Sequence, residues 1–304
     1  MIEHSSPETV RLARVVILGA SGVIGRALMP FLVDRGVSIL PVTSSELNLL
    51  DPDASGHLAG LLRQDDALVV LAGIPPRLGR DLAAMVQNVQ MAVNVCAALS
   101  KQPVAHVIYL SSDAVYPRSV EEVSEDSPVA PTDSYSAMHL VREDLFRRLV
   151  PAPVAVLRVT QICALHDTHD AYGPSRFIRM ATKEQRIVLF GRGEETRDHI
   201  QVEDVVALIH ACLMRRSQGV LNVATGRSIN FADVAALVAA QLDPPPEIQY
   251  APRQLPITHR TFDVSAMVRA FPEIGLTPLE AGLEKIVRHV VSSGSNYSGK
   301  VSHE

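Results

Sequence analysis

The chain contains no tryptophan, few other aromatic residues and only three cysteines, and these shortages exclude several classes of protein. Aromatic residues make up 4% of the sequence and hydrophobic residues 47%, so the core must consist mainly of Val, Leu, Ile and Ala. Such a composition is typical of a parallel sheet that helices cover on both faces. Cys96, Cys163 and Cys212 are odd in number and far apart. They exclude a disulfide framework and indicate a reducing, cytoplasmic compartment.

The sequence also lacks an excess of positive charge and long apolar runs. Its formal net charge is −5, so it has no basic footprint for nucleic acid. No run of roughly 18 uninterrupted apolar residues occurs, and no membrane span is predicted. Residues 1–14 lack the apolar stretch of a signal peptide. We expect the first ten residues and residues 292–304, which are polar, to form tails.

Short apolar runs alternate with amphipathic segments through the first half of the chain. We expect strands at 15–18, 37–42, 67–71, 104–110 and 154–159, and helices at 23–35, 51–63, 78–99 and 134–149. Strands that alternate with helices imply right-handed crossovers and a doubly wound parallel sheet. The sequence therefore predicts an α/β fold of Rossmann type, whose ligands bind at the carboxyl ends of the strands.

The alternation breaks after residue 159. Residues 166–199 and 226–304 have shorter elements and more proline, and we expect them to form a smaller C-terminal substrate-binding lobe. Residues 1–165 and 200–225 then form the dinucleotide-binding domain. In this second half we expect helices at 177–183, 202–214 and 231–241, and strands at 186–190 and 221–224.

Three glycines separate the first expected strand from the first helix, in Gly19-Ala-Ser-Gly22-Val-Ile-Gly25. Glycine permits a tight turn and lets backbone N–H groups approach a pyrophosphate, which the helix dipole also attracts. The spacing by itself is a weak signal, and a turn that merely needs positive φ is the alternative. Because of the flanking strand and helix, we predict a dinucleotide site made of Gly19, Ser21, Gly22, Val23, Ile24 and Gly25.

The second expected strand continues into Thr43 and Ser44, with no acidic residue before Glu46. NAD enzymes favour an acid at this point, where it binds the 2′-hydroxyl of the adenosine ribose. Small hydroxyl groups do not repel a 2′-phosphate, so the sequence slightly favours NADP over NAD. No arginine or lysine follows to bind that phosphate, and the preference is weak.

A serine, a tyrosine and a histidine form the most informative pattern in the chain. Ser111 and Ser112 follow the strand 104–110, while Tyr135 and His139 lie at the start of the helix 134–149. A spacing of four residues puts Tyr135 and His139 on one helix face. An alcohol, a phenol and a nitrogen base can move a proton on or off a sugar oxygen while hydride moves at carbon.

With these motifs the chain resembles an extended short-chain dehydrogenase/reductase of the nucleotide-sugar epimerase, dehydratase and reductase family, with likeness to the GDP-fucose synthase and UDP-galactose 4-epimerase types. The resemblance covers about residues 14–291. The resemblance implies NAD or NADP as cofactor, a nucleotide-sugar substrate and a homodimer. The further cofactor contacts that it implies are Leu50, Asp51, Ala72, Gly73, Asn88, Ser111, Tyr135 and His139.

The family resemblance also assigns the catalytic roles. The tyrosine is the general acid/base, which is Tyr135 here, and Ser112 bonds the same sugar oxygen. A lysine four residues after the tyrosine normally lowers its pKa, and His139 stands in that place. An imidazole, with a pKa of about 6.5, is mostly neutral at pH 7. We therefore expect Tyr135 to donate its proton and the enzyme to work as a reductase. An ordinary helix histidine in an inactive site is the alternative.

The two residues that follow Ser112 narrow the set of possible reactions. Family dehydratases have an acid pair at positions 113 and 114, and GDP-fucose synthases have an epimerising cysteine at 114, but this chain has Asp113 and Ala114. The resemblance thus implies 4-ketoreduction, with 4-epimerisation as the alternative. A non-catalytic dinucleotide-binding sensor is the alternative of another class.

The resemblance places the substrate contacts at Asp113, Ala114, Gln161, Arg176 and Arg197. Arg197 suits the nucleotide diphosphate, because its planar fork bonds phosphate oxygens in pairs; a surface ion pair with Asp198 is the alternative. His166 and His169 could ligate zinc only from a helix or a rigid hairpin, so we predict polar substrate contacts or solvent exposure there and no metal.

Overall fold

The computed structural model describes residues 1–6, 8–76, 78–79, 81–165, 167, 173–253 and 256–293. Its centre is a seven-stranded sheet in the order β1-β11-β7-β5-β4-β2-β3. The strands are β1 (Glu3–His4), β2 (Arg14–Leu18), β3 (Ile39–Val42), β4 (Asp66–Val70), β5 (His106–Ser112), β7 (Val154–Val159) and β11 (Ser217–Val223). All pairings except that of β1 are parallel, which confirms the predicted Rossmann-type α/β fold.

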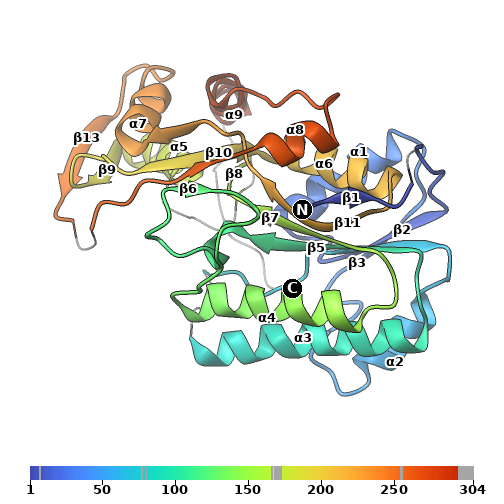
Figure 1. Ribbon diagram of the computed structural model, residues 1–304. Helices are drawn as coiled ribbons and strands as arrows, with labels where there is room; N and C mark the ends of the chain where they lie inside the picture. The colour runs from blue at the N-terminus through green and yellow to red at the C-terminus, as the bar shows by residue number, and fades with distance from the viewer. Residues whose placement is uncertain are drawn as a thin grey trace.

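Helices cover both faces of this sheet (Figure 1). On one face lie α2 (Ala54–Leu61), α3 (Leu82–Lys101) and α4 (Ser134–Leu149), and on the other α1 (Val23–Val33), α6 (Val202–Met214) and α8 (Ser265–Ala270). Successive strand residues alternate between the two resulting clusters: Val16 packs with α3, and Val15 packs with α6. Because both faces are buried, the strands have continuous apolar runs.

The order of the strands reverses between β2 and β4, which creates the crevice where ligands of such sheets bind. The turns that follow these two strands touch. Gly19 has φ 85°, and a Cβ there would lie 2.7 Å from the backbone nitrogen of Ala72. A Cβ on Gly25 would lie 2.5 Å from the carbonyl oxygen of Ala20. Only glycine allows both close approaches.

The rest of the chain builds smaller sheets beside the main one. They pair β8 (Gln161–Cys163), β10 (Thr196–Gln201) and β12 (Ser228–Asn230); β9 (Arg186–Phe190) and β13 (Glu247–Ala251); and β6 (Glu122–Val123) with β14 (Thr261–Phe262). Helices α5 (Pro174–Glu184), α7 (Phe231–Ala239) and α9 (Leu279–Ser293) enclose a separate apolar cluster. The expected division at residues 165, 200 and 225 stays a prediction. Helix α8 lies outside this cluster, because Met267 packs against the main sheet.

Several element bounds differ from those expected. The first residues are not a free tail, because Glu3 and His4 pair with β11 and His4 also bonds Ser217 and Ala270. Strand β5 extends through Ser112, so both serines belong to the strand. Helix α3 begins at Leu82, where the Asp81 side chain accepts a hydrogen bond from the backbone N–H of Ala84. Each difference depends on a hydrogen bond that apolar periodicity does not show.

Helix α3 is long and apolar enough to cross a membrane by length and composition, with a mean hydropathy of 1.4. Its residues Ala92, Val95 and Leu99 are buried against the main sheet, and α4 packs beside it. A core helix of a water-soluble protein passes the same test. That the chain has no membrane span stays a prediction.

Candidate active site

The glycine turn lies open at the carboxyl end of β2. Gly22 is the N-cap of α1, and no side chain caps that helix end. The backbone N–H groups of the first helical turn are therefore available to an anion, and the helix dipole adds attraction. Ser21 and Gly22 are exposed, and Gly25 is buried against the chain before it. This geometry suits a pyrophosphate, and the six cofactor contacts expected in residues 19–25 stay predictions.

Two buried side chains form hydrogen bonds with the backbone of the loop after β4. Asn88 is 2% exposed, and its Oδ1 accepts the backbone N–H of Ile74 at 2.8 Å. Arg142 donates from Nη2 to the carbonyl oxygen of Ala72 at 2.8 Å. A Cβ on Gly73 would lie 3.0 Å from both side chains. Asn88 thus holds the loop that was expected to contact the cofactor, and a direct contact of its own stays a prediction.

An acidic side chain lies at the end of β3 after all. Glu46 Oε2 accepts the backbone N–H and the hydroxyl of Thr43, both at 2.8 Å. The backbone hydrogen bond, followed by the one from the Thr43 hydroxyl, lowers the pKa of Glu46, so the carboxylate stays ionised. Ser44 is exposed beside it. Asp51 follows in a turn, where it accepts a hydrogen bond from Asn48 at 2.7 Å.

The catalytic serine candidate lies at the junction of β5 and a short 3-10 helix, η1 (Asp113–Val115). Ser112 is half-buried, and its Oγ accepts the backbone N–H of Ala114 at 3.2 Å. Arg260 donates to the Asp113 carbonyl oxygen at 3.1 Å and to its Oδ2 at 3.3 Å. Burial raises the pKa of Asp113, and Arg260 opposes that shift. Asp113 is therefore anchored by an arginine that sequence reasoning missed.

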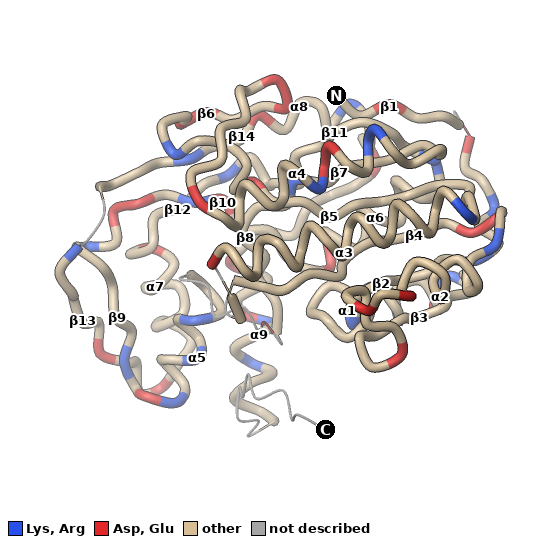
Figure 2. Tube along the Cα trace, turned by 90° about the horizontal axis from the view of Figure 1, so that it is seen from below, with Lys and Arg blue, Asp and Glu red and all other residues tan. Residues whose placement is uncertain are grey.

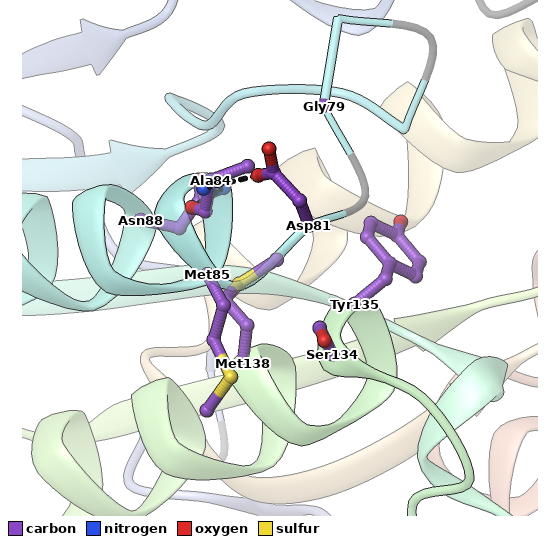
Figure 3. Close-up of a pocket in the computed structure, with 8 residues that line it drawn as sticks. All are labelled: Gly79, Asp81, Ala84, Met85, Asn88, Ser134, Tyr135 and Met138. Carbon is purple, nitrogen blue, oxygen red and sulfur yellow. Dashed lines mark hydrogen bonds between the residues drawn. The ribbon is translucent and has the colours of Figure 1, made fainter.

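The tyrosine and histidine candidates meet as the spacing predicts. A capping box formed by Asp133 and Ser136 fixes the start of α4. Tyr135 is half-buried, and its ring lies edge-on to that of His139, with centroids 4.7 Å apart. Figure 3 shows the phenol oxygen of Tyr135 pointing away from α4, beside a cavity of about 10 Å³ between α3 and α4. Helix α4, which holds Tyr135, packs against β5 and η1, the two elements that meet at Ser112.

Buried polar contacts anchor α4 to the sheet. Glu143 pairs with Arg158 through two hydrogen bonds of 3.0 and 2.7 Å, and accepts the Ser111 hydroxyl at 2.6 Å. The side chain of Ser111 is thus turned into the core, which leaves its backbone for any cofactor contact. His139 is 8% exposed, and its Nδ1 lies 2.8 Å from the hydroxyl of Tyr109 on β5. Sequence reasoning missed Tyr109, Arg142 and Glu143, although the last two share a helix face with Tyr135 or His139.

Arg197 lies on β10, and its guanidinium is held by backbone and hydroxyl groups. It donates to the carbonyl oxygen of Thr258 at 2.8 Å and to its Oγ1 at 2.8 Å. Among the described residues, its carboxylate partner is Glu195, at 3.8 Å. The alternative of a surface ion pair with Asp198 is wrong, because Asp198 is fully buried and accepts hydrogen bonds from Thr225.

Several buried polar atoms near β8 and β10 have no hydrogen-bond partner among the described residues, which is costly unless another group or solvent supplies one. Strand pairing places Gln161 opposite His199, and Gly173 packs against both side chains. Burial, and then the charge of Arg197, lowers the pKa of His199 to about 3, so its ring is neutral. The unpartnered atoms are Gln161 Oε1, His199 Nδ1 and Nε2, Ser175 Oγ and Arg176 Nε.

The histidine-rich segment lies mostly outside the described residues, which include Asp167 but neither His166 nor His169. Within the described ranges, no three His, Cys, Asp or Glu side chains gather as a metal site would require.

Comparison with known proteins agrees with this geometry. Residues 15–224 match the family model described as the NAD dependent epimerase/dehydratase family. A curated relative is dTDP-L-rhamnose 4-epimerase of Burkholderia thailandensis, 25% identical over 177 residues, which is 51% of this chain and 46% of the relative. The chain therefore matches about half the length of that relative.

Solved structures share the whole fold at low sequence identity. MoeE5 in complex with UDP-glucuronic acid and NAD has a TM-score of 0.80 at 23% identity, covering 92% of this chain and all (100%) of that one. A GDP-L-fucose synthetase from Naegleria fowleri has a TM-score of 0.84 at 16% identity, covering 96% and 98%. A UDP-glucose 4-epimerase from Thermotoga maritima with UDP-glucose has a TM-score of 0.83 at 18%, covering 93% and 100%.

Proposed function

Because the chain belongs to the NAD dependent epimerase/dehydratase family, we propose that it reduces the 4-keto group of a nucleotide-activated sugar with a nicotinamide cofactor. One observation supports this most: the ring centroids of Tyr135 and His139 lie 4.7 Å apart on α4. This helix packs against the end of β5, where Ser112 lies. A phenol and an alcohol on adjoining elements can serve one sugar oxygen.

Tyr135 is the proposed proton donor, and Ser112 orients the same oxygen. When bound, NADH or NADPH supplies the hydride. Tyr135 must then give a proton to the oxygen, so its phenol has to be protonated beforehand. His139 is 8% exposed, and burial disfavours a charged imidazolium. Without a cation at position 139, Tyr135 keeps its proton, which favours reduction over oxidation.

The nucleotide diphosphate is the proposed partner of Arg197. The guanidinium groups of Arg197 and Arg260 both interact electrostatically with the Asp113 carboxylate, so positive charge gathers beside the end of β5. A guanidinium whose nearest ion-pair partner is 3.8 Å away can bond phosphate oxygens. The unpartnered atoms of Gln161 and His199 supply further polar contacts for sugar or phosphate.

A 4-epimerase is the second candidate, and Glu46 favours it. Its carboxylate bonds Thr43, the residue after the second long strand, near which NAD enzymes have an acid for the adenosine ribose. An epimerase needs NAD that stays bound and returns its hydride. The similarity to the dTDP-L-rhamnose 4-epimerase of Burkholderia thailandensis points the same way. On this evidence we infer that the site takes NAD in preference to NADP, contrary to the slight preference drawn from the sequence.

One experiment separates the two candidates. The purified protein is denatured and any released nucleotide is identified by mass spectrometry. The protein is then incubated with NADH or NADPH and a panel of 4-keto sugar nucleotides. Consumption of one reduced cofactor per sugar converted supports the reductase. Retained NAD, with interconversion of C4 epimers and no net redox, supports the epimerase.

The variant Tyr135→Phe tests the role of the phenol in either reaction. Loss of a general acid/base should lower kcat by about 100-fold or more. Tyr250→Phe is the matched control, because Tyr250 is 66% exposed on β13. Turnover of Tyr135→Phe within about twofold of the parent protein contradicts the proposal.

We also infer a cytoplasmic homodimer that pairs through the outer side of α3 and α4. Lys101 is the one charged residue of α3, and Val86, Val93 and Val141 are exposed on this face. Figure 2 views the molecule from this side and shows α3 uncharged along most of its length. Light scattering on the purified protein, with Val86→Glu as the disrupting variant, measures the assembly state; a monomeric parent protein contradicts it.

A further inference from the structure

His139 contacts a buried tyrosine that the proposed chemistry does not use. Its Nδ1 lies 2.8 Å from the hydroxyl oxygen of Tyr109. Tyr109 is 1% exposed, and its ring stacks on that of Phe146, with centroids 4.8 Å apart and planes 28° apart. Close packing of this kind leaves the phenol a single position, so the contact with His139 is a fixed part of the core.

Tyr109 is the donor in this hydrogen bond. Burial raises the pKa of its phenol, so the hydroxyl keeps its proton. In the part of the chain that the structure describes, His139 Nδ1 is the acceptor within reach of that hydroxyl. If Nδ1 donated instead, the buried phenol hydrogen would lack a partner, which is costly. Nδ1 therefore accepts, and a neutral imidazole then has its hydrogen on Nε2.

A buried cation also lies over the ring of Tyr109. Arg142 is 2% exposed, and the carbon of its guanidinium is 5.0 Å from the centroid of the Tyr109 ring. It donates to Ala72 and Asn88, and within the described ranges it forms no ion pair. The neighbouring carboxylate, Glu143, is already paired with Arg158. In the described part of the chain, Arg142 is therefore a buried positive charge without a counter-charge.

That charge acts on His139, which lies one turn earlier in α4. Two positive charges close together in a buried region repel each other strongly. Arg142 thus opposes protonation of His139, while the Tyr109 hydroxyl occupies the nitrogen that would otherwise take up the proton.

We propose that Tyr109 and Arg142 hold His139 as the neutral tautomer with hydrogen on Nε2, so that position 139 offers a hydrogen-bond donor in place of a positive charge. Tyr109 is thus a positioning residue that acts through His139. The role in turnover rests on the proposed function, whereas the tautomer is a property of the free protein.

Nitrogen NMR of histidine-labelled protein without ligands tests the tautomer directly. We expect His139 Nδ1 to give the signal of an unprotonated nitrogen and Nε2 that of a protonated one. Tyr109→Phe keeps the stacked ring but removes the donor, and should shift both signals toward a mixture of tautomers. Protonated Nδ1 in the parent protein, or unchanged signals in the variant, overturns the proposal. Assignment comes from the signal lost in His139→Ala.

Two further variants make the test specific. Tyr116→Phe removes another buried phenol hydroxyl, which bonds Asn222 and Arg158, and should leave the His139 signals unchanged. Arg142→Met removes the buried charge and should raise the pH at which His139 takes up a proton. An unmoved titration of His139 in Arg142→Met would remove Arg142 from the proposal.

Turnover gives a second readout through a double-mutant cycle. Tyr109→Phe should lower kcat by about tenfold, the effect of one buried hydrogen bond, with KM for the sugar nucleotide little changed. In a His139→Ala protein, the same change should have no further effect, because Tyr109 acts only through His139. Equal losses in both backgrounds contradict this. If no sugar nucleotide is turned over, the proposed function fails while the NMR result still decides the tautomer.

Discussion

Glu46 accepts two hydrogen bonds from Thr43, from its backbone N–H and from its hydroxyl, each at 2.8 Å. The four-residue turn thereby folds an ionised carboxylate back onto the end of β3. In NAD enzymes an acid near the end of the second strand bonds the 2′-hydroxyl of the adenosine ribose, and we propose that Glu46 has this role here. The contact gives the first prediction a structural basis.

Glu46→Gln should weaken the preference for NAD. We expect the parent protein to bind NAD more tightly than NADP, and the ratio of the two affinities to fall by about tenfold in the variant, since one charge repulsion is removed. Titration of each cofactor by calorimetry measures the ratio. Asp53→Asn removes an exposed charge a few residues on and is the control. Tighter binding of NADP by the parent protein would refute the inference.

Arg197→Met should weaken binding of the nucleotide sugar without changing cofactor affinity. Loss of charge-assisted hydrogen bonds to a diphosphate is expected to raise Kd by about 10- to 100-fold. Calorimetry with the substrate nucleoside diphosphate measures it. Arg192→Met is the matched control, because Arg192 is exposed on the preceding turn. Equal effects of the two variants would show that Arg197 has no special part in binding.

Glu143→Gln should destabilise the fold by about 3 kcal/mol, because it leaves the buried guanidinium of Arg158 without its counter-charge. Urea unfolding measures the free energy of unfolding. Asp144→Asn, next in α4, breaks an ion pair whose side chains are 61% and 76% exposed. No measurable loss is expected there. Similar losses in both variants would mean that burial of the Glu143 pair does not matter to stability.

His199 should make the protein sensitive to acid. Burial lowers its pKa to about 3 in the folded chain, while an unfolded histidine titrates at about 6.5. Between these values the unfolded state binds more protons, so stability falls as the pH drops from about 6.5 toward 3. His199→Phe should remove part of this fall in Tm, and His57→Gln, an exposed histidine, should not. A parallel fall in all three proteins contradicts the assignment.

Much of the α/β fold was predictable because its signals are local. Apolar periodicity gave the bounds of α4, β7, β9 and α6 as the structure has them. The four-residue spacing of Tyr135 and His139 predicts their ring contact, since side chains one helical turn apart face the same way. The glycines of the turn after β2 likewise predict a close approach of backbone segments. A Cβ on Gly19 would meet the backbone of Ala72, and a Cβ on Gly25 would meet the backbone of Ala20.

Other features depend on pairs that lie far apart in the chain. Glu3 pairs with Gln218, Arg260 bonds Asp113, and Tyr109 meets His139, with nothing in the local pattern to mark any of them. Glu46 is an intermediate case. Its residue type was visible, but only the turn geometry brings the carboxylate back to Thr43.

The sequence by itself determined the kind of sheet, the turn after the first long strand and the candidate catalytic side chains, because periodicity and spacing act over one or two helical turns. Tertiary structure decided the environment of those side chains. Burial and neighbouring charge shift the pKa values of His199 and Asp113, and both effects arise from residues that only folding brings together.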